Sequence, residues 1–160
     1  MAPERGSRIK PRAFVKEADD KVEDLPDRAI SRHRNFVTPK GLAAVDAAIV
    51  RFEEAHREAS SAPDAHAAAA AMRELRYWRA RRASAEVVRP PVRADTASFG
   101  TAVTLRREDG RAQKTFRIVG EDEADPAHGT ISYVSPLARA VMRCGPGEIA
   151  RRKAEILDVR

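Results

Sequence analysis

Apolar positions recur at alternating steps of three and four residues after Pro39, which is the spacing of one side of a helix. This seam contains Leu42, Val45, Ile49, Phe52 and, as its one polar member, His56. Thr38 and Pro39 suit the start of the helix, because the threonine hydroxyl can cap the first turn and the missing proline N–H costs nothing there. We expect this helix to run from Pro39 to about Ser60.

A second seam of the same kind contains Ala68, Ala71, Leu75, Trp78 and Ala85, with Arg82 as its polar interruption. Between the seams, "SSAPD" predicts a turn in which Ser61 and Asp64 form a capping box for the second helix and Pro63 lies in its first turn. Two helices of about 22 residues, each roughly 33 Å long at 1.5 Å per residue, predict an antiparallel coiled-coil hairpin. Pro90 and Pro91 cannot continue a helix and end the hairpin.

After residue 98 the pattern changes from helical to alternating. "TAVTL" and "KTFRIVG", separated by the turn "REDG", predict a β-hairpin, and "TISYV" predicts a third strand. Ser135 and Pro136 then suit the start of a helix of about two turns, which Gly145 would end. "EIARR" and "AEILDV" predict two more strands, so we expect a compact α+β unit of about five strands and one helix.

The first 35 residues mix charges with prolines and show no lasting apolar period, which predicts a mostly disordered arm. The predicted organisation is therefore an arm over residues 1–35, a helical hairpin over 36–89, a linker over 90–98 and a small domain over 99–160. The predicted fold class is α+β.

Composition adds little to the prediction of the fold but narrows the range of possible functions. Hydrophobic residues make up 42% of the 160 residues and charged residues 34%, and no apolar run is long enough to span a membrane. The N-terminal stretch lacks the apolar segment of a secretory signal, so we expect a cytoplasmic protein without a membrane partner. The net charge of +6 favours a polyanion or an acidic protein surface as partner, although an arginine-rich solubilising surface would give the same charge.

Conventional enzyme sites find no support in the sequence. The four histidines lack metal-site spacing, the single cysteine, Cys144, excludes a disulfide framework, and neither a nucleophile elbow nor a phosphate-binding loop occurs. We therefore predict no metal site, no resident cofactor and no small-molecule substrate. A broad basic face on the second helix could meet the phosphates of nascent RNA or DNA, or simply solubilise the hairpin; it comprises Arg73, Arg76, Arg79 and Arg82.

A family resemblance brings these residues together. The stretch "FGTAVTLRREDGRAQKTFRIVGEDEADPAHGTISYVSPLARAVM" closely resembles the C-terminal domain of the bacterial Gre transcript-cleavage and elongation factors, in which "FG..V.L", "F.IVG.DEAD" and "G.IS..SP.ARA" recur in this order. "FVTPKGL" and "RRASAEVV" resemble the two ends of the family's helical hairpin, so the resemblance covers about residues 36–159. It implies an FKBP-like fold for the C-terminal domain.

The resemblance also implies a partner and its docking residues. Gre factors dock on the rim of the RNA polymerase secondary channel and insert the hairpin into it. The implied polymerase-binding residues are Asp122, Glu123, Asp125, Ser135, Pro136 and Arg139. Family members often have Asp or Asn before the Ser-Pro pair, where this chain has Val134.

The hairpin tip departs from the family pattern. Gre factors carry two acidic residues there, in a motif such as "GDLSEN", which help to hold a second Mg²⁺ ion in the polymerase active centre. This chain has "EASSAPDAHA", in which Glu58 and Asp64 are the candidate carboxylates, and its hairpin is shorter. The sequence therefore favours a secondary-channel regulator, not itself an enzyme, without efficient transcript cleavage.

Two alternatives remain open at this point. The protein could be a transcript-cleavage factor that uses Glu58 or Asp64, or an interaction protein like the nucleoside diphosphate kinase regulators, which the short hairpin favours. A peptidyl-prolyl isomerase is disfavoured because it needs an aromatic-lined pocket, and we expect the domain's own core to take up Phe99, Phe116 and Tyr133.

Overall fold

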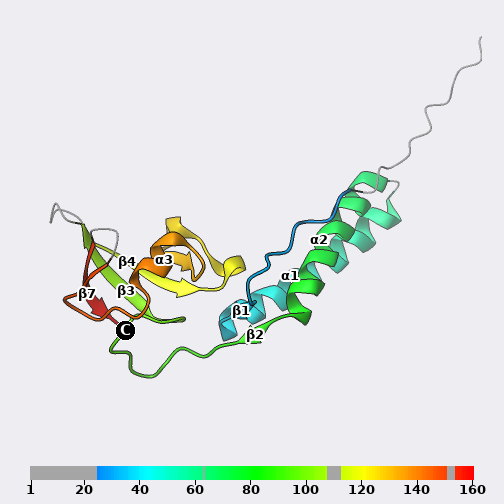
Figure 1. Cartoon of the computed structure of the whole chain (residues 1–160). Coiled ribbons are helices and arrows are strands. Elements are labelled where there is room, and N and C mark those ends of the chain that lie inside the picture. The colour runs from blue at the N-terminus through cyan, green and yellow to red at the C-terminus, as the bar shows by residue number, and fades with distance from the viewer. Residues whose placement is uncertain (1–24, 63, 108–112, 151–153) are drawn as a thin grey trace, which may run out of the picture.

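A helical hairpin and a small sheet domain lie end to end in the computed structural model (Figure 1). The structure describes residues 25–62, 64–107, 113–150 and 154–160. It confirms the predicted α+β class, while the FKBP-like character of the sheet domain stays a prediction. Among the described helices, none is long and apolar enough to cross a membrane.

The hairpin consists of α1, Pro39–Ser61, and α2, Ala65–Ala83. Thr38 caps α1 as predicted, since its Oγ1 accepts a hydrogen bond from the Gly41 N–H at 2.9 Å. The residues buried between the helices are mostly small: Val45, Ala48, Ala71 and Leu75. Small side chains at such a contact let two helices approach closely.

The predicted capping box at the turn is wrong. Helix α1 continues through Ser61, whose hydroxyl donates to the Arg57 carbonyl at 2.9 Å. This serine therefore belongs to α1 and does not cap α2. Asp64 itself caps α2, because its Oδ1 accepts from the Ala67 N–H at 2.9 Å. Pro63 lies outside the described residues, and Ala85 lies beyond the end of α2.

A short parallel pair of strands at the base of the hairpin was not predicted. Strand β1, Phe36–Val37, pairs with β2, Glu86–Val87. The buried Asn35 secures this base, because its Nδ2 donates to the Arg81 carbonyl near the end of α2 at 2.7 Å. Strands of two residues carry no periodic signal, which is why the sequence pattern gives no sign of them.

The sheet domain has the predicted five strands and one helix, in the order β5-β4-β3-β7-β6. The strands are β3 Ala102–Arg107, β4 Gln113–Val119, β5 Thr130–Ser132, β6 Ile149–Ala150 and β7 Ala154–Val159, and the helix is α3 Pro136–Val141. Strands β4 and β5 are parallel, and the other neighbours are antiparallel. Most of the "REDG" turn lies outside the described residues.

Helix α3 and the sheet enclose the main core, in which Ile118, Ala138, Val141 and Ile156 are fully buried. Ser135 caps α3 as predicted. The helix ends before the predicted Gly145, because the chain already reverses at Arg143, which adopts a left-handed φ of 73°. The loop between β4 and β5 contains the 3₁₀ helices η1, Glu121–Glu123, and η2, Pro126–His128.

The structure differs from the predicted disordered arm over residues 25–35. This segment, which we call the strap, runs extended along α2 toward β1 (Figure 1). Its Arg28 guanidinium lies 3.7 Å from the centroid of the Tyr77 ring and donates to Glu74 at 2.6 Å. Cation–π and ionic partners on α2 thus order a segment whose own sequence has no periodic signal. Residues 1–24 of the predicted arm lie outside the described residues.

Candidate functional site

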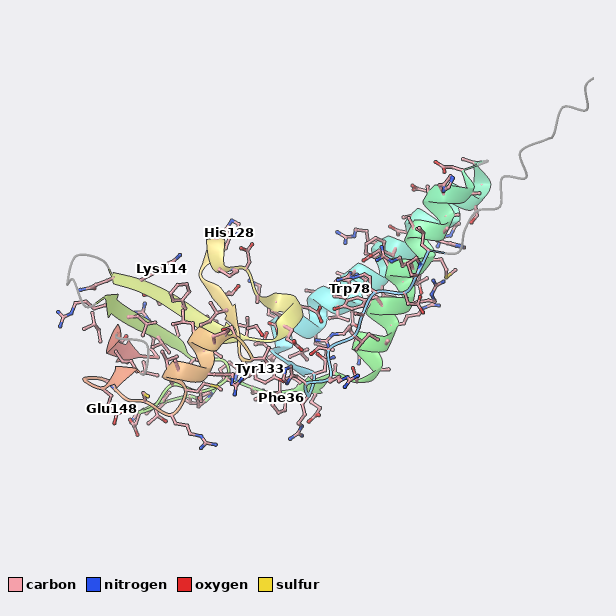
Figure 2. All side chains as sticks on the ribbon, turned by 45° about the horizontal axis from the view of Figure 1, so that its top comes forward. Phe36, Trp78, Lys114, His128, Tyr133 and Glu148 are labelled. Carbon is pink, nitrogen blue, oxygen red and sulfur yellow. The ribbon has the colours of Figure 1, made fainter. Side chains whose placement is uncertain are left out.

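The acidic loop after β4 meets the base of the hairpin, and two of the predicted docking residues, Asp122 and Glu123, lie at this contact. We call this contact the joint. It comprises Thr38, Tyr77, Arg81, Asp122 and Glu123. Figure 2 shows Phe36 and Tyr133 near one another where the two parts of the molecule meet, with Trp78 further along the hairpin.

Asp122 binds the last turns of α2. Its Oδ2 accepts from Arg81 Nε at 2.5 Å, and its Oδ1 accepts from the Tyr77 hydroxyl at 2.5 Å. Glu121 adds a second carboxylate 3.9 Å from the Arg81 guanidinium. The Arg81 side chain is only 2% exposed, so its charge depends on these carboxylates for compensation.

Glu123 binds the start of α1. Its two oxygens accept from the Thr38 N–H at 2.8 Å and from the Thr38 hydroxyl at 2.5 Å. A carboxylate at this position also faces the positive end of the helix dipole. Two adjacent acidic residues of η1 therefore hold two different helices of the hairpin.

Three aromatic rings close one side of the joint. The centroid of Phe36, in β1, lies 5.9 Å from that of Phe99 and 5.3 Å from that of Tyr133, distances typical of edge and tilted ring contacts. The Tyr133 hydroxyl donates to the Arg34 carbonyl. The prediction that the domain's own core takes up the aromatic rings holds for Phe116 and Tyr133, which pack against that core. Phe99 and Tyr133 also contact Phe36 at the base of the hairpin, which was not predicted.

Both tyrosines of the chain lie at or near the joint, and both are expected to ionise at a higher pH than free tyrosine. Burial, and next the hydrogen bond to Asp122, raise the pKa of Tyr77 to about 12. Burial, and next the charge of Glu121, raise the pKa of Tyr133 above its ordinary value. A phenol with a folded pKa above its unfolded value stabilises the fold below the unfolded value near pH 10, and this stabilisation is lost as the pH rises toward 12.

Ultraviolet absorbance of tyrosinate measures this prediction directly. Alkaline titration of the folded protein should show two late steps, and Tyr77→Phe should remove the later one. Tyr133→Phe serves as the control, because it should remove the earlier step alone. Two steps at the pKa of free tyrosine, while circular dichroism still shows the folded chain, would contradict the burial of both hydroxyls.

The remaining predicted docking residues are placed differently. Pro136, Arg139 and Asp125 are exposed, whereas Ser135 is occupied as the cap of α3. The carboxylate of Asp125 accepts from the Ala127 N–H and contacts the His128 ring within its own loop, and the hydrogen bond with His128 lowers its pKa. The structure thus separates Asp122 and Glu123, which face the hairpin, from an outward-facing set.

Three of the four arginines of the predicted basic face of α2 pair with carboxylates of the chain, and the fourth, Arg73, contacts a backbone carbonyl. Arg73 donates to the Pro26 carbonyl at 2.7 Å. The carboxylate partners are Asp27 for Arg76 at 2.6 Å, Glu53 for Arg79 at 2.7 Å and Asp46 for Arg82 at 2.6 Å. Exposed ion pairs of this kind contribute only about 0–1 kcal/mol each. The face is less positive than the sequence alone indicates, and contact with nascent RNA or DNA stays a prediction.

The two candidate tip residues do not have equivalent roles. Asp64 caps α2 with its carboxylate, while Glu58 is exposed near the end of α1. Over the described ranges, no group of three or more His, Cys, Asp or Glu side chains could hold a metal ion. The observed role of Asp64 is therefore structural.

A cleft of about 630 Å³ lies beside the joint, between the start of α1 and the sheet domain. Val37, Val45 and Val119 give it apolar walls, and Trp78 is the one aromatic among its described lining residues. A pocket with a single aromatic wall does not resemble the aromatic-lined site that a prolyl isomerase needs.

Comparison with known proteins identifies the sheet domain. Residues 92–157 match the sequence model of the family described as "Transcription elongation factor, GreA/GreB, C-term". Transcription elongation factor GreB of Neisseria meningitidis serogroup B is 41% identical over 96 residues, which cover 54% of this chain and 58% of that protein. Transcription elongation factor GreA of Syntrophotalea carbinolica is 49% identical over 61 residues, which cover 38% of this chain and 39% of that protein.

Among solved structures, GreA factor homolog 1 (Gfh1) of Thermus thermophilus matches with a TM-score of 0.37 at 14% identity, covering 80% of this chain and 99% of that chain. The fold and the joint define a two-part protein in which a small α+β domain carries a helical hairpin. The sheet domain matches the sequence model of the GreA/GreB C-terminal domain, which confirms the resemblance to the Gre family seen in the sequence. The chain spans 58% of the length of the Neisseria relative.

Local signals did not reveal Tyr77 and Arg81 as site residues. Arg81 lies among neighbouring arginines, and the helical seam favours Arg82 as the inward one. Its partner Asp122 is 41 residues away in sequence. Only a pairing between the predicted acidic loop and the predicted basic helix could have indicated the contact.

Proposed function

We propose that the protein is an RNA polymerase-binding regulator of transcription elongation that acts at the secondary channel without efficient transcript cleavage. The observation that carries the proposal is a GreA/GreB C-terminal domain attached to a hairpin whose tip carboxylate, Asp64, caps a helix. The similar proteins are named transcription elongation factors, which supports the same process for this chain.

Docking is assigned to the outward-facing part of the sheet domain. Asp125, Pro136 and Arg139 are exposed there and offer a negative, an apolar and a positive contact. Charges at the rim of an interface chiefly set the association rate and the choice of partner. Asp122 and Glu123 contribute indirectly, because they hold the hairpin to this domain.

The tip argues against efficient cleavage. Two-metal hydrolysis needs carboxylates placed to hold the weaker metal ion, with oxygen atoms at about 2.0 to 2.6 Å from it. Helix α1 has 23 residues, and each turn that a hairpin lacks withdraws its tip by about 5.4 Å. A tip that is short by even one turn cannot bring Glu58 to a metal ion held inside the polymerase. The protein needs no metal of its own for this role, since the Mg²⁺ ions belong to the polymerase.

RNA release from a stalled, backtracked elongation complex tests the proposal. We expect no shortened RNA from this protein alone, and inhibition of cleavage by an added Gre factor. Glu58→Gln and Asp64→Asn should change neither result, and Asn keeps the cap of α2 because it caps helices about as well as Asp. Shortened RNA that disappears in either variant would instead make the protein a cleavage factor.

A second candidate is an interaction protein of the nucleoside diphosphate kinase regulator type. The short hairpin, with helices of 23 and 19 residues, favours it. It predicts binding to nucleoside diphosphate kinase and none to core RNA polymerase. A binding measurement with each purified protein at low salt separates the two candidates.

A further inference from the structure

We propose that Asp122 and Glu123 are positioning residues that fix the direction of the hairpin relative to the sheet domain. Docking of the sheet domain on a partner protein would then determine the direction of the hairpin tip before the tip itself contacts that partner. The consequence for the polymerase rests on the proposed function above. The fixed direction itself rests only on contacts within the chain.

The acidic loop anchors the hairpin at two points. Asp122 holds α2 through Arg81 and Tyr77, while Glu123 holds α1 through Thr38. A single contact would let the hairpin rotate about that point. Two contacts on two helices, made by neighbouring residues of one 3₁₀ turn, restrict the rotation.

The loop that carries the two carboxylates is itself held by hydrogen bonds and close contacts. The Thr130 hydroxyl donates to the Glu123 carbonyl at 3.0 Å, and the Tyr133 N–H donates to the Val119 carbonyl at 2.9 Å. Gly120 approaches the hairpin so closely that an added Cβ would lie 2.5 Å from the Phe36 carbonyl oxygen. The loop is therefore tied to β5 on one side and lies against β1 on the other.

The covalent connection between the hairpin and the sheet domain has no regular structure. Residues 88–101 link β2 to β3, contain Pro90 and Pro91, and form no helix or strand. Val88 is bound to the hairpin base through its N–H, and Ala97 is buried in the core of the sheet domain, so the free connection is the short stretch between them. Because this stretch has no regular structure, non-covalent contacts contribute to the orientation, and among the described ion pairs Arg81–Asp122 is the most protected from water.

Distance measurement by double electron–electron resonance tests the fixed direction. Spin labels are attached at Ser60→Cys, near the hairpin tip, and Lys114→Cys, on the sheet domain, in a Cys144→Ser background. We expect one narrow distance distribution in the parent and a distribution at least about twice as broad in Asp122→Ala/Glu123→Ala. Equal widths in the parent and in this double variant would overturn the proposal.

Asp125→Asn is the matched control, since it removes one charge from the same loop but its partners are local. It should leave the distance distribution unchanged, and broadening by this variant would overturn the assignment to the joint. If the double alanine variant does not fold, the nearly isosteric Asp122→Asn/Glu123→Gln replaces it. This variant should still broaden the distribution, and a parent-like width would equally overturn the proposal.

Inhibition of transcript cleavage is a second measurement, independent of the distance measurement. Inhibition of a competing Gre factor, normalised to the amount of bound protein, should fall about tenfold in the double variant because few molecules present the hairpin correctly. Unchanged normalised inhibition despite a broadened distance would overturn the link between hairpin direction and activity. If the parent does not bind polymerase, the proposed function fails, while the distance result still decides whether the joint fixes the hairpin.

Discussion

Replacing Arg81 with alanine is expected to lower the free energy of unfolding by about 3 kcal/mol, because it leaves the largely buried carboxylate of Asp122 without its charged partner. The Arg81 side chain is 2% exposed and that of Asp122 is 11% exposed, so water cannot readily replace the lost contact. The Tyr77 hydroxyl remains as a donor to Asp122 but supplies no positive charge. Urea unfolding monitored by the fluorescence of Trp78, the single tryptophan, measures the loss.

Arg82→Ala is the natural control for this measurement. The two arginines are adjacent, but Arg82 is exposed and pairs with the exposed Asp46 at 2.6 Å. Such a pair is worth about 0–1 kcal/mol, so Arg82→Ala should have little effect. If Arg81→Ala costs no more than Arg82→Ala, the buried ion pair does not stabilise the joint.

Gly120→Ala is expected to disrupt the joint by steric overlap, at a cost of about 1 to 3 kcal/mol. The new Cβ would lie 2.5 Å from the Phe36 carbonyl oxygen, which belongs to the backbone and cannot rotate away. The φ of Gly120 is −64°, so alanine meets no conformational penalty there and the effect reports the contact alone. Thermal unfolding measures the cost, and the spin-label distance should broaden as well.

Gly41→Ala provides the comparison, because its added Cβ would meet the flexible Glu123 side chain at 2.0 Å instead of backbone. Adding Glu123→Ala should remove this overlap, so the two substitutions should be non-additive. Gly120→Ala should still overlap with the Phe36 carbonyl in the Glu123→Ala background. Full stability of Gly120→Ala would show that the loop and the hairpin base are not in close contact.

The parts of the fold that the sequence predicted have local signals. Thr38 with Pro39 and Ser135 with Pro136 mark helix starts through contacts within one turn, and the alternating strands reveal their buried face by period alone. The β1–β2 pair and the strap have no such signal. Their partners lie elsewhere in the chain, as in the hydrogen bond between Arg28 and Glu74, 46 residues apart.

The candidate site also depends on contacts between residues that are distant in sequence. The resemblance drew attention to Asp122 and Glu123 correctly, but a sequence does not say whether a carboxylate faces a partner or its own chain. Similarly, the arginines of α2 are evident in the sequence, but the sequence does not show that carboxylates of α1 and the strap pair with them. A helical seam could not identify Arg81 as the buried arginine, because the seam describes contact with α1 and Arg81 faces the sheet domain.

Tyr77 has two partners at once: its ring faces the Arg28 guanidinium of the strap, and its hydroxyl donates to Asp122 of the joint. A substitution at this position therefore disturbs two contacts that are otherwise far apart in the sequence. In the evolution of the protein, positions 28, 77 and 122 should consequently change together rather than independently. A lineage that replaces the tyrosine with a smaller residue would be released from constraint on the strap arginine as well, and its N-terminal segment could then diverge freely.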